Sequence, residues 1–355
     1  MIVVLADDLS GAAELAGIAV GHGLPVELQT AFAPDTDAEV VCVTTESRAL
    51  APTEAASVVA EASARIVAAN PNWIFKKCDS VLRGPVVAEA RAMAQAAGLG
   101  KILLVPANPS RDRIIRDGRY LVRGRPLPET EFARDPLHPR NTAVVADLLG
   151  GDLAGIEVPD VSAATDVADQ AARVDRATIA AGAADFFSAL LRLRVPARPA
   201  PAAPPGPASG PCLLVCGSSA AWSQRQAEAV ARGIRVFARP HDLATVRQAL
   251  AETPQVLLGI GDGPDTRNRT AAALEQRLAG SVGQVLQQRP VGRLLLEGGA
   301  TAAAVVRAMG WTRFRAQSVA GEGVGEFQPI GGDGPQVFIK PGSYAWPSAL
   351  WPGLR

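Results

Sequence analysis

The chain has 355 residues, 48% of them hydrophobic and 20% charged, so it is long enough for two domains and has the composition of an ordinary globular protein. Lys plus Arg equals Asp plus Glu, at 35 each, and this balance gives no reason to expect nucleic acid or a membrane surface as a partner. No apolar run approaches the roughly 20 residues of a membrane span, we see no signal peptide, and the four cysteines lack zinc-type or disulfide-type spacing, so we expect a cytoplasmic protein.

The first part of the chain alternates apolar runs with helical patterns. Residues 2–6 predict a buried strand that ends at Asp7 and Asp8, and Ser10 is predicted to cap the helix that follows. Further strands are expected over 39–48, 73–80 and 101–110, the last of these running into a loop, and helices are expected over 51–70 and 85–98.

A proline-rich segment divides the chain. Residues 196–211 contain seven prolines and predict a polyproline-II-like tether between a first domain, 1–195, and a second domain, 212–355. In the second domain 212–219 leads into a helix over 220–233, 255–263 is a strand with a glycine-rich turn, and 293–299 leads into a helix over 300–310. Such alternation predicts two α/β domains with mostly parallel sheets, which we expect to face each other across a cleft.

In open α/β sheets, ligands bind beyond the carboxyl ends of the strands. The unusual polar residues of this chain lie at such positions. In the first domain they are mostly charged: Asp7, Asp8, Arg48, Lys76, Lys77, Asp79, Ser80, Arg83 and Asn108. In the second domain they are small: Gly217, Ser218, Ser219, residues 261–263, Gly298, Gly299 and Thr301.

The stretch "KKCDSVLRGP" follows an apolar strand and begins with two of the four lysines of the chain. Side chains alternate along a strand, so Lys76 and Lys77 are predicted to point apart, with Lys77 and Asp79 on one side. We expect Ser80 and Arg83 near the start of the next helix, where free N–H groups favour an anion. The stretch therefore predicts a site for a carboxylate or phosphate; the alternative is a salt-bridged strand end.

Asp7 and Asp8 allow three interpretations: ligands of Mg²⁺, partners of sugar hydroxyls, or a general base. An acidic helix N-terminus is the structural alternative. Phosphatases of the haloacid dehalogenase type also begin with a strand that ends in aspartates, but their two aspartates are spaced by one residue, whereas these are adjacent.

In the second domain "LEGGATAAAVV" places two glycines at a strand-to-helix turn, where a phosphate could approach backbone N–H groups. The chain has no GxxxxGK[ST] motif, so this is not a P-loop. Lys340 and Gly342 end a further strand, and together these patterns indicate a nucleotide or phosphate site. The arginine-rich stretch 111–140 is interpreted as a solvated loop.

Several motifs in order resemble the four-carbon acid sugar kinases, a family that includes threonate, erythronate and 3-oxo-tetronate kinases. They are "VVLADDLSGAAELAG", "KKCDSVLRGP", "PANPSRDRIIRDGRYLV", "ETEFARDPLHP", "CGSS", "LEGGATAAAVV" and "KPGSYAWP". The sequence departs from the usual family pattern at Val81 and at Ala300, and in the C-terminal "KPGSYAW".

The resemblance implies an N-terminal acid-sugar-binding domain and a C-terminal domain that binds ATP. The residues that it places at the sugar are Asp8, Arg48, Lys77, Ser80 and Arg83. Asp79 or Asp7 would orient or deprotonate the attacking hydroxyl, and Lys340 would stabilise the transferred phosphoryl group together with Mg²⁺ and backbone N–H groups. The residues that it places at ATP are Ser218, Gly261, Gly298, Gly299, Ala300, Thr301 and Gly342.

The sequence thus predicts a cytoplasmic ATP-dependent kinase that phosphorylates a hydroxyl of a small acid sugar, with ATP and Mg²⁺ as cofactors and no protein ligand assigned to a metal. Its partner is the sugar, without nucleic acid or membrane, and the chain is either a monomer or a homodimer. A phosphatase-type enzyme that uses the same acidic pair, and a non-catalytic protein that binds acid sugars, are the alternatives.

Overall fold

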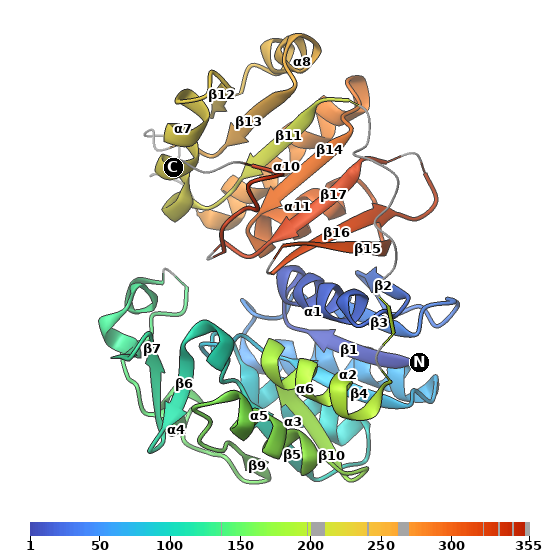
Figure 1. Ribbon diagram of the computed structural model, residues 1–355, viewed down its shortest axis with the longest axis vertical. Helices are drawn as coiled ribbons and strands as arrows, with labels where there is room; N and C mark the ends of the chain where they lie inside the picture. Colours follow the sequence, from blue (N-terminus) through green and yellow to red (C-terminus); the bar gives the residue numbers. More distant parts are fainter. Residues whose placement is uncertain are drawn as a thin grey trace. The chain divides into compact units, whose positions relative to one another are not determined.

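A computed structural model gives the fold of the chain and describes residues 1–135, 137–196, 198–199, 210–239, 241–261, 270–321, 323–332, 334–342 and 344–351 (Figure 1). The chain divides into two compact units, Met1–Pro25 with Gln29–Ala200 and Val26–Leu28 with Pro201–Arg355. Both units are α/β with mostly parallel strands, as the sequence predicts. Most of the proline-rich tether predicted over 196–211 lies outside the described residues.

The first unit is built on a sheet of parallel strands in the order β3–β1–β4–β10–β5–β9. These strands are β1 (Ile2–Ala6), β3 (Val40–Thr44), β4 (Trp73–Lys77), β5 (Lys101–Val105), β9 (Ile156–Glu157) and β10 (Thr178–Gly182). The helices are α1 (Leu9–Gly21), α2 (Pro52–Ala68), α3 (Val86–Ala96), the short α4 (Val145–Leu148), α5 (Ala164–Ala172) and α6 (Ala184–Arg194). Helix α1 packs against α6, and α2 packs against α3.

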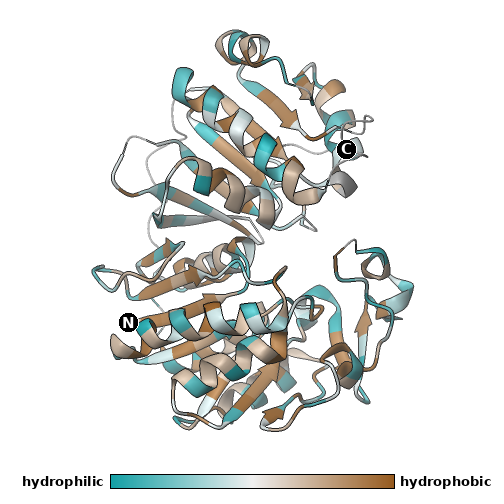
Figure 2. Ribbon diagram, turned by 180° about the vertical axis from the view of Figure 1, so that it is seen from behind, coloured by the Kyte–Doolittle hydropathy of each residue, from teal (hydrophilic) through white to brown (hydrophobic). Residues whose placement is uncertain are grey.

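The strands of this sheet are continuous apolar runs because helices cover the sheet, and Figure 2 shows them as hydrophobic bands between amphipathic helices. Val3, Val4 and Leu5 of β1 are completely buried. The ring centroid of Phe75 in β4 lies 6.0 Å from that of Phe186 and 5.2 Å from that of Phe187, both in α6. Burial of these runs is what drives the strands to form where the sequence predicts them.

Part of the arginine-rich stretch 111–140 is not the predicted solvated loop. It holds an antiparallel sheet of β6 (Arg113–Arg116), β7 (Arg119–Val122) and β8 (Arg125–Pro126), flanked by the 3₁₀ turns η1 (Pro109–Arg111), η2 (Leu127–Glu129) and η3 (Glu131–Arg134). Asp117 and Gly118 join β6 to β7 with φ of 50° and 66°, the positive values that a two-residue hairpin turn of type I′ requires. Tyr120 faces the interior and is completely buried.

The second unit is built on a sheet in the order β12–β13–β11–β14–β17–β16–β15–β2. Its strands are β11 (Cys212–Cys216), β12 (Arg235–Ala238), β13 (Gln255–Gly259), β14 (Arg293–Glu297), β15 (Arg313–Gly321), β16 (Val324–Pro329) and β17 (Gln336–Lys340), joined by β2 (Val26–Gln29). Its helices include α7 (Ser219–Val230), α8 (Leu243–Glu252), α10 (Ala271–Gln288) and α11 (Gly299–Ala308). The first five strands in this order are parallel, whereas β16 and β15 are antiparallel.

Strand β2 departs from the predicted boundary, because Val26–Leu28 belong to the second unit although the sequence places them within 1–195. The strand lies next to β15 at the edge of the second sheet. Its Glu27, which is only 4% exposed, accepts hydrogen bonds from the guanidinium of Arg313, with a distance of 3.0 Å between Nη2 and Oε2. A buried carboxylate needs such a partner, and the partner lies 286 residues further along the chain, beyond the reach of local patterns.

The register of the strands aligns their carboxyl ends. In the first unit Ala6 pairs with both Thr44 and Lys77, and Lys77 pairs with Gly182. In the second unit Cys216 pairs with both Gly259 and Glu297, and Glu297 pairs with Lys340. The polar residues predicted to bind ligands therefore lie together at the carboxyl ends of the strands in each unit. We call this side of each sheet its edge below.

Two further expectations concern the whole chain. All four cysteines, whose spacing is neither zinc-type nor disulfide-type, are free and buried. Within the described part of the chain, each helix is too short or too polar to pass through a lipid bilayer.

Candidate active site

Arg48 joins the two aspartates that follow β1. Its guanidinium donates to all four carboxylate oxygens of Asp7 and Asp8, over distances of 2.7–3.0 Å between nitrogen and oxygen. Asp7 is 2% exposed, and the side chain of Arg48 is 20% exposed. Burial alone would raise the pKa of Asp7, but the charge and hydrogen bonds of Arg48 outweigh burial and lower it. Both aspartates are thus committed to an internal ion pair.

Asp8 is also the N-cap of α1. Its Oδ1 accepts from the backbone N–H of Gly11 at 2.8 Å, and its Oδ2 accepts from the hydroxyl of Ser10 at 2.6 Å. The predicted cap at Ser10 is therefore wrong: the helix begins at Leu9, Asp8 is its N-cap, and Ser10 supports the cap from inside the first turn.

Asp79 forms a second charged group with Arg83 and Asp135. Arg83 donates to both carboxylate oxygens of Asp79, at 3.0 and 2.8 Å, and through Nη1 to Asp135 at 3.0 Å. Burial would raise the pKa of Asp79, but Arg83 and then Arg48 hold it well below its usual value. The carboxylate also accepts the backbone N–H groups of Val81 and Arg83, both at 3.1 Å.

These contacts change the interpretation of the predicted anion site. The backbone N–H groups that follow β4 bind an internal anion, the Asp79 carboxylate. Ser80 and Arg83 lie in the loop between β4 and α3 rather than on the first turn of α3, which begins at Val86.

The two lysines point to opposite sides of β4, as their alternation predicts. Lys76 pairs with Glu89 of α3 at 2.7 Å, and the other carboxylate oxygen of Glu89 accepts from the hydroxyl of Ser47 at 2.6 Å. Lys77 approaches Glu14 of α1 at 3.5 Å and donates to the carbonyl of Cys78 at 2.8 Å. Both lysines are at most 3% exposed, so they are paired within the protein interior.

Ser80 connects this edge to the hairpin sheet. Its hydroxyl accepts a hydrogen bond from Nη1 of Arg113, and its carbonyl accepts one from the hydroxyl of Tyr120. The guanidinium carbon of Arg113 lies 5.3 Å from the ring centroid of Phe132, and that of Arg83 lies 5.8 Å from the same ring. No role is predicted from the sequence for Arg113, Tyr120 or Phe132; the motif "ETEFARDP" is the signal in the sequence for Phe132 and Asp135.

A glycine makes the close approach to Arg48 feasible. Gly84 has φ of +83°, and a Cβ atom there would lie 2.9 Å from the carbonyl oxygen and 3.1 Å from Cγ of Arg48. Leu82 also has a positive φ, 62°, which is unusual for a bulky residue. The loop between β4 and α3 thus has a strained backbone that its polar contacts hold in place.

The second unit brings most of its predicted residues to one edge. Ser218 caps α7, with its hydroxyl accepting from the N–H of Ala221 at 3.3 Å, and a Cβ on Gly342 would lie 3.8 Å from that hydroxyl. Gly298, with φ of +100°, is the N-cap of α11 and provides no side-chain hydrogen bond, and Ala300 is exposed in the first turn. Gly261, with φ of +69°, follows β13, and residues 262–269 after it lie outside the described residues.

Gly217 and Thr301 define the closest contact of this edge. A Cβ on Gly217 would lie only 1.7 Å from the hydroxyl oxygen of Thr301, which is 3% exposed. The absence of a side chain at 217 therefore lets the turn after β11 lie directly against the start of α11.

Lys340 is a buried framework residue in the structure. Its ammonium donates to Glu297 at 2.9 Å, to the carbonyl of Pro341 at 3.0 Å and to that of Tyr344 at 2.6 Å, which uses its three N–H donors. Burial lowers its pKa, partly offset by the charge of Glu297. Glu297 is completely buried and also accepts from Arg225 at 2.9 Å. In this arrangement Lys340 has no N–H left for a phosphate.

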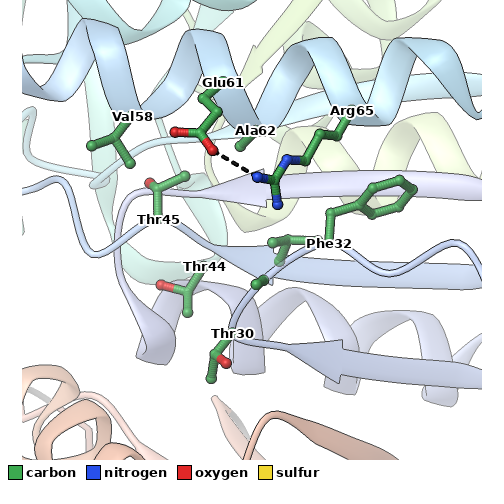
Figure 3. Close-up of a pocket in the computed structure, with 10 residues that line it drawn as sticks. Thr30, Phe32, Thr44, Thr45, Val58, Glu61, Ala62 and Arg65 are labelled. Carbon is green, nitrogen blue, oxygen red and sulfur yellow. Dashed lines mark hydrogen bonds and ion pairs between the residues drawn. The ribbon is translucent and has the colours of Figure 1, made fainter.

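Two hollows in the first unit lie apart from the charged groups. One has a volume of about 170 Å³ and is lined by residues that include Thr30, Phe32 and Thr45, with Glu61 and Arg65 paired at its rim (Figure 3). The other has a volume of about 280 Å³, and the residues that line it include Pro52, Arg91 and Asp152. None of the predicted site residues lines either hollow. In the described parts of the chain, no group of three or more His, Cys, Asp or Glu residues could hold a metal ion.

Residues 2–188, more than half of the chain, match the profile of the family described as the sugar-binding N-terminal domain, and the chain belongs to this family. The chain is 38% identical to D-threonate kinase of Bordetella bronchiseptica over 157 residues, and 36% identical to D-erythronate kinase of Heliobacterium modesticaldum over 155 residues. Each match covers 42% of this chain but only 39% and 35% of the two relatives, so the aligned segments span less than half the length of these curated proteins. The family resemblance predicted from the motifs is confirmed.

Solved structures show the same fold. A crystal structure of a Salmonella typhimurium LT2 protein superposes with a TM-score of 0.78 at 16% identity, covering 97% of this chain and 96% of that one. A Bordetella bronchiseptica protein with a domain of unknown function (DUF1537) was solved as a domain-swapped dimer with bound citrate. It superposes with a TM-score of 0.50 at 27% identity, covering 97% of this chain and 95% of that one.

Proposed function

We propose that this protein is an ATP-dependent kinase that phosphorylates a hydroxyl of a small, four-carbon acid sugar. The observation that carries the proposal is the charged edge of the first unit, which lies in the part of the chain that matches the sugar-binding family. Relatives named as kinases of threonate, erythronate and 3-oxo-tetronate support the substrate class. No similarity supports the phosphatase alternative or the non-catalytic one.

The first unit would bind the sugar. Its edge presents Arg48, Asp79, Ser80 and Arg83 in fixed positions, since each bonds to a neighbour in the structure. Fixed hydrogen-bonding groups suit a small polyhydroxy acid, whose hydroxyls must be held in one orientation for transfer. Citrate in the related Bordetella protein is likewise a small hydroxy acid. Lys77 and Asp8 would act by holding this edge, because both are bonded inside it.

Asp79 and Asp7 remain the proposed catalytic residues, with orientation of the attacking hydroxyl as their main role. Both pKa values are lowered, so both side chains are ionised and weakly basic at neutral pH. Phosphoryl transfer passes through a loose transition state that depends on positioning and charge stabilisation more than on early proton removal. A weak base is therefore compatible with catalysis, and the hydroxyl proton can leave late in the transfer.

The second unit would bind ATP at the edge that carries Ser218, Gly261, Gly342 and the turn from Gly298 to Thr301. Helix α11 begins without a side-chain cap and without an acidic residue in its first turn, which leaves N–H donors and the positive end of the helix dipole for a phosphate. Ala300 would contribute to this: where the family pattern usually has an acid, its methyl group adds no negative charge. Mg²⁺ would arrive bound to the nucleotide, since the described residues offer it no cluster of ligands.

Phosphoryl transfer requires that the protein bind the acid sugar and ATP at the same time, and this requirement can be tested. ADP release should be measured with a panel of D- and L-threonate, D- and L-erythronate and 3-oxo-tetronate, each with and without ATP. A kinase of this class should release ADP with one or two members of the panel and bind each ligand more tightly when the other is present. Release of phosphate from phosphorylated sugars without ATP would instead support a phosphatase, and binding without turnover would support a non-catalytic protein.

A homodimer is part of the proposal because the related Bordetella structure is a domain-swapped dimer. Light scattering coupled to size-exclusion chromatography should give twice the mass of 36.7 kDa that the sequence predicts. A monomer at micromolar concentration would remove dimerisation from the proposal and leave the kinase assignment unaffected.

A further inference from the structure

The arginines at the edge of the first unit differ in whether they already bind carboxylates. Arg48 binds Asp7 and Asp8, and Arg83 binds Asp79 and Asp135. Each guanidinium is thus shared by two carboxylates, whose negative charges more than offset its positive charge. A guanidinium that is neutralised in this way adds little new binding energy for a substrate carboxylate, because an existing bond must first be given up.

Arg113 is different. Its hydrogen-bond partner is the hydroxyl of Ser80, a neutral group, and among the residues that the structure describes no carboxylate lies within ion-pair distance of it. Glu131, whose carboxylate is close enough to be influenced by the charge of Arg113, is bound by Arg123 at 2.7 Å. Arg113 is only partly exposed, so water does not fully replace the missing counter-charge.

Two contacts fix the position of the Arg113 guanidinium: its hydrogen bond to Ser80 and its contact with the ring of Phe132. Its guanidinium lies over the ring of Phe132, with 5.3 Å between guanidinium carbon and ring centroid, and Arg83 lies over the same ring at 5.8 Å. Phe132 is 7% exposed and therefore anchored. A ring that contacts two guanidinium groups restricts their movement before any ligand arrives, so less side-chain entropy is lost when an anion binds.

Ser80 adds a donor beside this guanidinium. Its hydroxyl accepts from Arg113, which leaves its own O–H free to donate, and its backbone is held through the carbonyl by the buried Tyr120. A guanidinium fork beside a hydroxyl donor matches the two oxygens of a carboxylate. Arg140 also has no carboxylate partner in the described parts of the chain, but its guanidinium already donates to the carbonyls of Leu82 and His138.

We propose that Arg113, together with Ser80, binds the carboxylate of the acid sugar, while Arg48 and Arg83 hold the aspartates that face its hydroxyls. The inference rests on the proposed function for its ligand class and assigns the acid group to one place in the site. Arg113 would thereby decide the preference for an acid over the corresponding uncharged polyol.

The test compares Arg113→Ala with Arg113→Lys and with a control, Arg119→Ala, in the full chain. Arg119 lies on the next strand of the same hairpin sheet and is exposed. A charge-assisted hydrogen bond contributes about 1.5–3 kcal/mol, so Arg113→Ala should raise the Kd and KM of the acid about 10- to 100-fold. The KM of the matching tetritol should not change, and Arg113→Lys should recover part of the loss because it keeps the charge but not the fork. Arg119→Ala should leave every value unchanged.

Calorimetric binding of four-carbon acids separates this inference from the proposed kinase activity. If the wild type binds an acid without releasing ADP, and Arg113→Ala loses that binding, the kinase proposal fails and the role of Arg113 stands. If the wild type phosphorylates an acid and Arg113→Ala does so with unchanged KM, or loses acid and tetritol equally, the role of Arg113 is overturned. A wild type that binds none of the acids overturns both.

Discussion

Replacement of Arg48 by alanine tests whether the charges at the edge of the first unit are structural. In the structure one guanidinium holds two carboxylates that are almost completely buried. The variant Arg48→Ala would leave Asp7 and Asp8 adjacent, buried and without their shared cation. We expect the first unit to lose stability, and to lose more of it at neutral than at acidic pH.

The magnitude follows from the burial of the partners. Removing one partner of a buried ion pair costs about 3–5 kcal/mol, because the other charge stays buried. Arg48 is 20% exposed, so water partly screens the pair, and we expect a cost near the lower limit, about 3 kcal/mol at pH 7.5. In a domain of this size that loss corresponds to a fall of about 6–12 °C in melting temperature.

The sign of the pH dependence also follows. In the wild type the lowered pKa of Asp7 means that the pair stabilises the fold above the unfolded pKa and that this contribution is lost as the pH falls. Without Arg48, only the smaller effects of Lys76 and Lys77 oppose the effect of burial, so the pKa of Asp7 should rise. As the pH falls, protonation of Asp7 removes its buried charge and so reduces the destabilisation of the variant. The difference in stability between variant and wild type should therefore be smaller at pH 5 than at pH 7.5.

Differential scanning calorimetry at both pH values gives the difference, and hydrogen exchange of peptides from 1–21 and 40–50 assigns it to the first unit. The control is Arg65→Ala, which breaks a surface pair with Glu61 between side chains that are 61% and 70% exposed, and which should cost about 0.5 kcal/mol or less. Equal losses for Arg48→Ala and Arg65→Ala at pH 7.5, or a loss by Arg48→Ala that does not depend on pH, would refute the reasoning.

Three further outcomes are expected. Burial raises the pKa of Glu46 to about 7, so the folded state loses stability as the pH rises from the pKa of the unfolded state through 7. Glu46→Gln should therefore stabilise the chain by about 1–3 kcal/mol at pH 8 and by much less at pH 4.5, as measured by urea unfolding. Gly217→Ala should destabilise the second unit and weaken ATP binding, since its methyl group would overlap Thr301, whereas Gly280→Ala, with nothing within 4 Å of the added atom, should be neutral or stabilising in the same thermal and calorimetric assays. Glu89→Ala should cost about 3 kcal/mol or more by leaving Lys76 buried without its partner, and a melting temperature within 2 °C of the wild type would contradict the pairing.

The strands of both units could be predicted from the sequence because burial on both faces makes them continuous apolar runs. Residues 2–6, for example, are predicted and found as a strand. Their polar carboxyl ends were predictable for the same reason, since each run stops where the chain leaves the sheet. This simple rule located the charged edge of the first unit and the glycine-rich edge of the second.

The pairing of the charges was not predictable. Arg48 lies about 40 residues from its aspartates, and no local pattern shows which of several carboxylates a guanidinium will reach. The N-cap was assigned to Ser10 because Ser is a common cap, although the better placed Asp8 precedes it. The hairpin around Asp117 was missed because its arginines obscured the alternation that ends at the buried Tyr120.

The distinction between paired and unpaired charges decides what an arginine-rich edge can do. A buried ion pair gains little stability over apolar packing, so its main effect is to fix geometry: Arg48 and Arg83 hold four carboxylates against rotation. The positive charges of Arg48 and Arg83 are already offset by these carboxylates, so the two arginines cannot attract a further anion strongly. An anion requires a donor that these ion pairs leave unsatisfied, and the sequence cannot reveal that donor because satisfied and unsatisfied arginines look alike in it. In our proposal anion binding in the first unit therefore depends on Arg113, which the contact with the ring of Phe132 fixes in place and which has no carboxylate partner among the described residues.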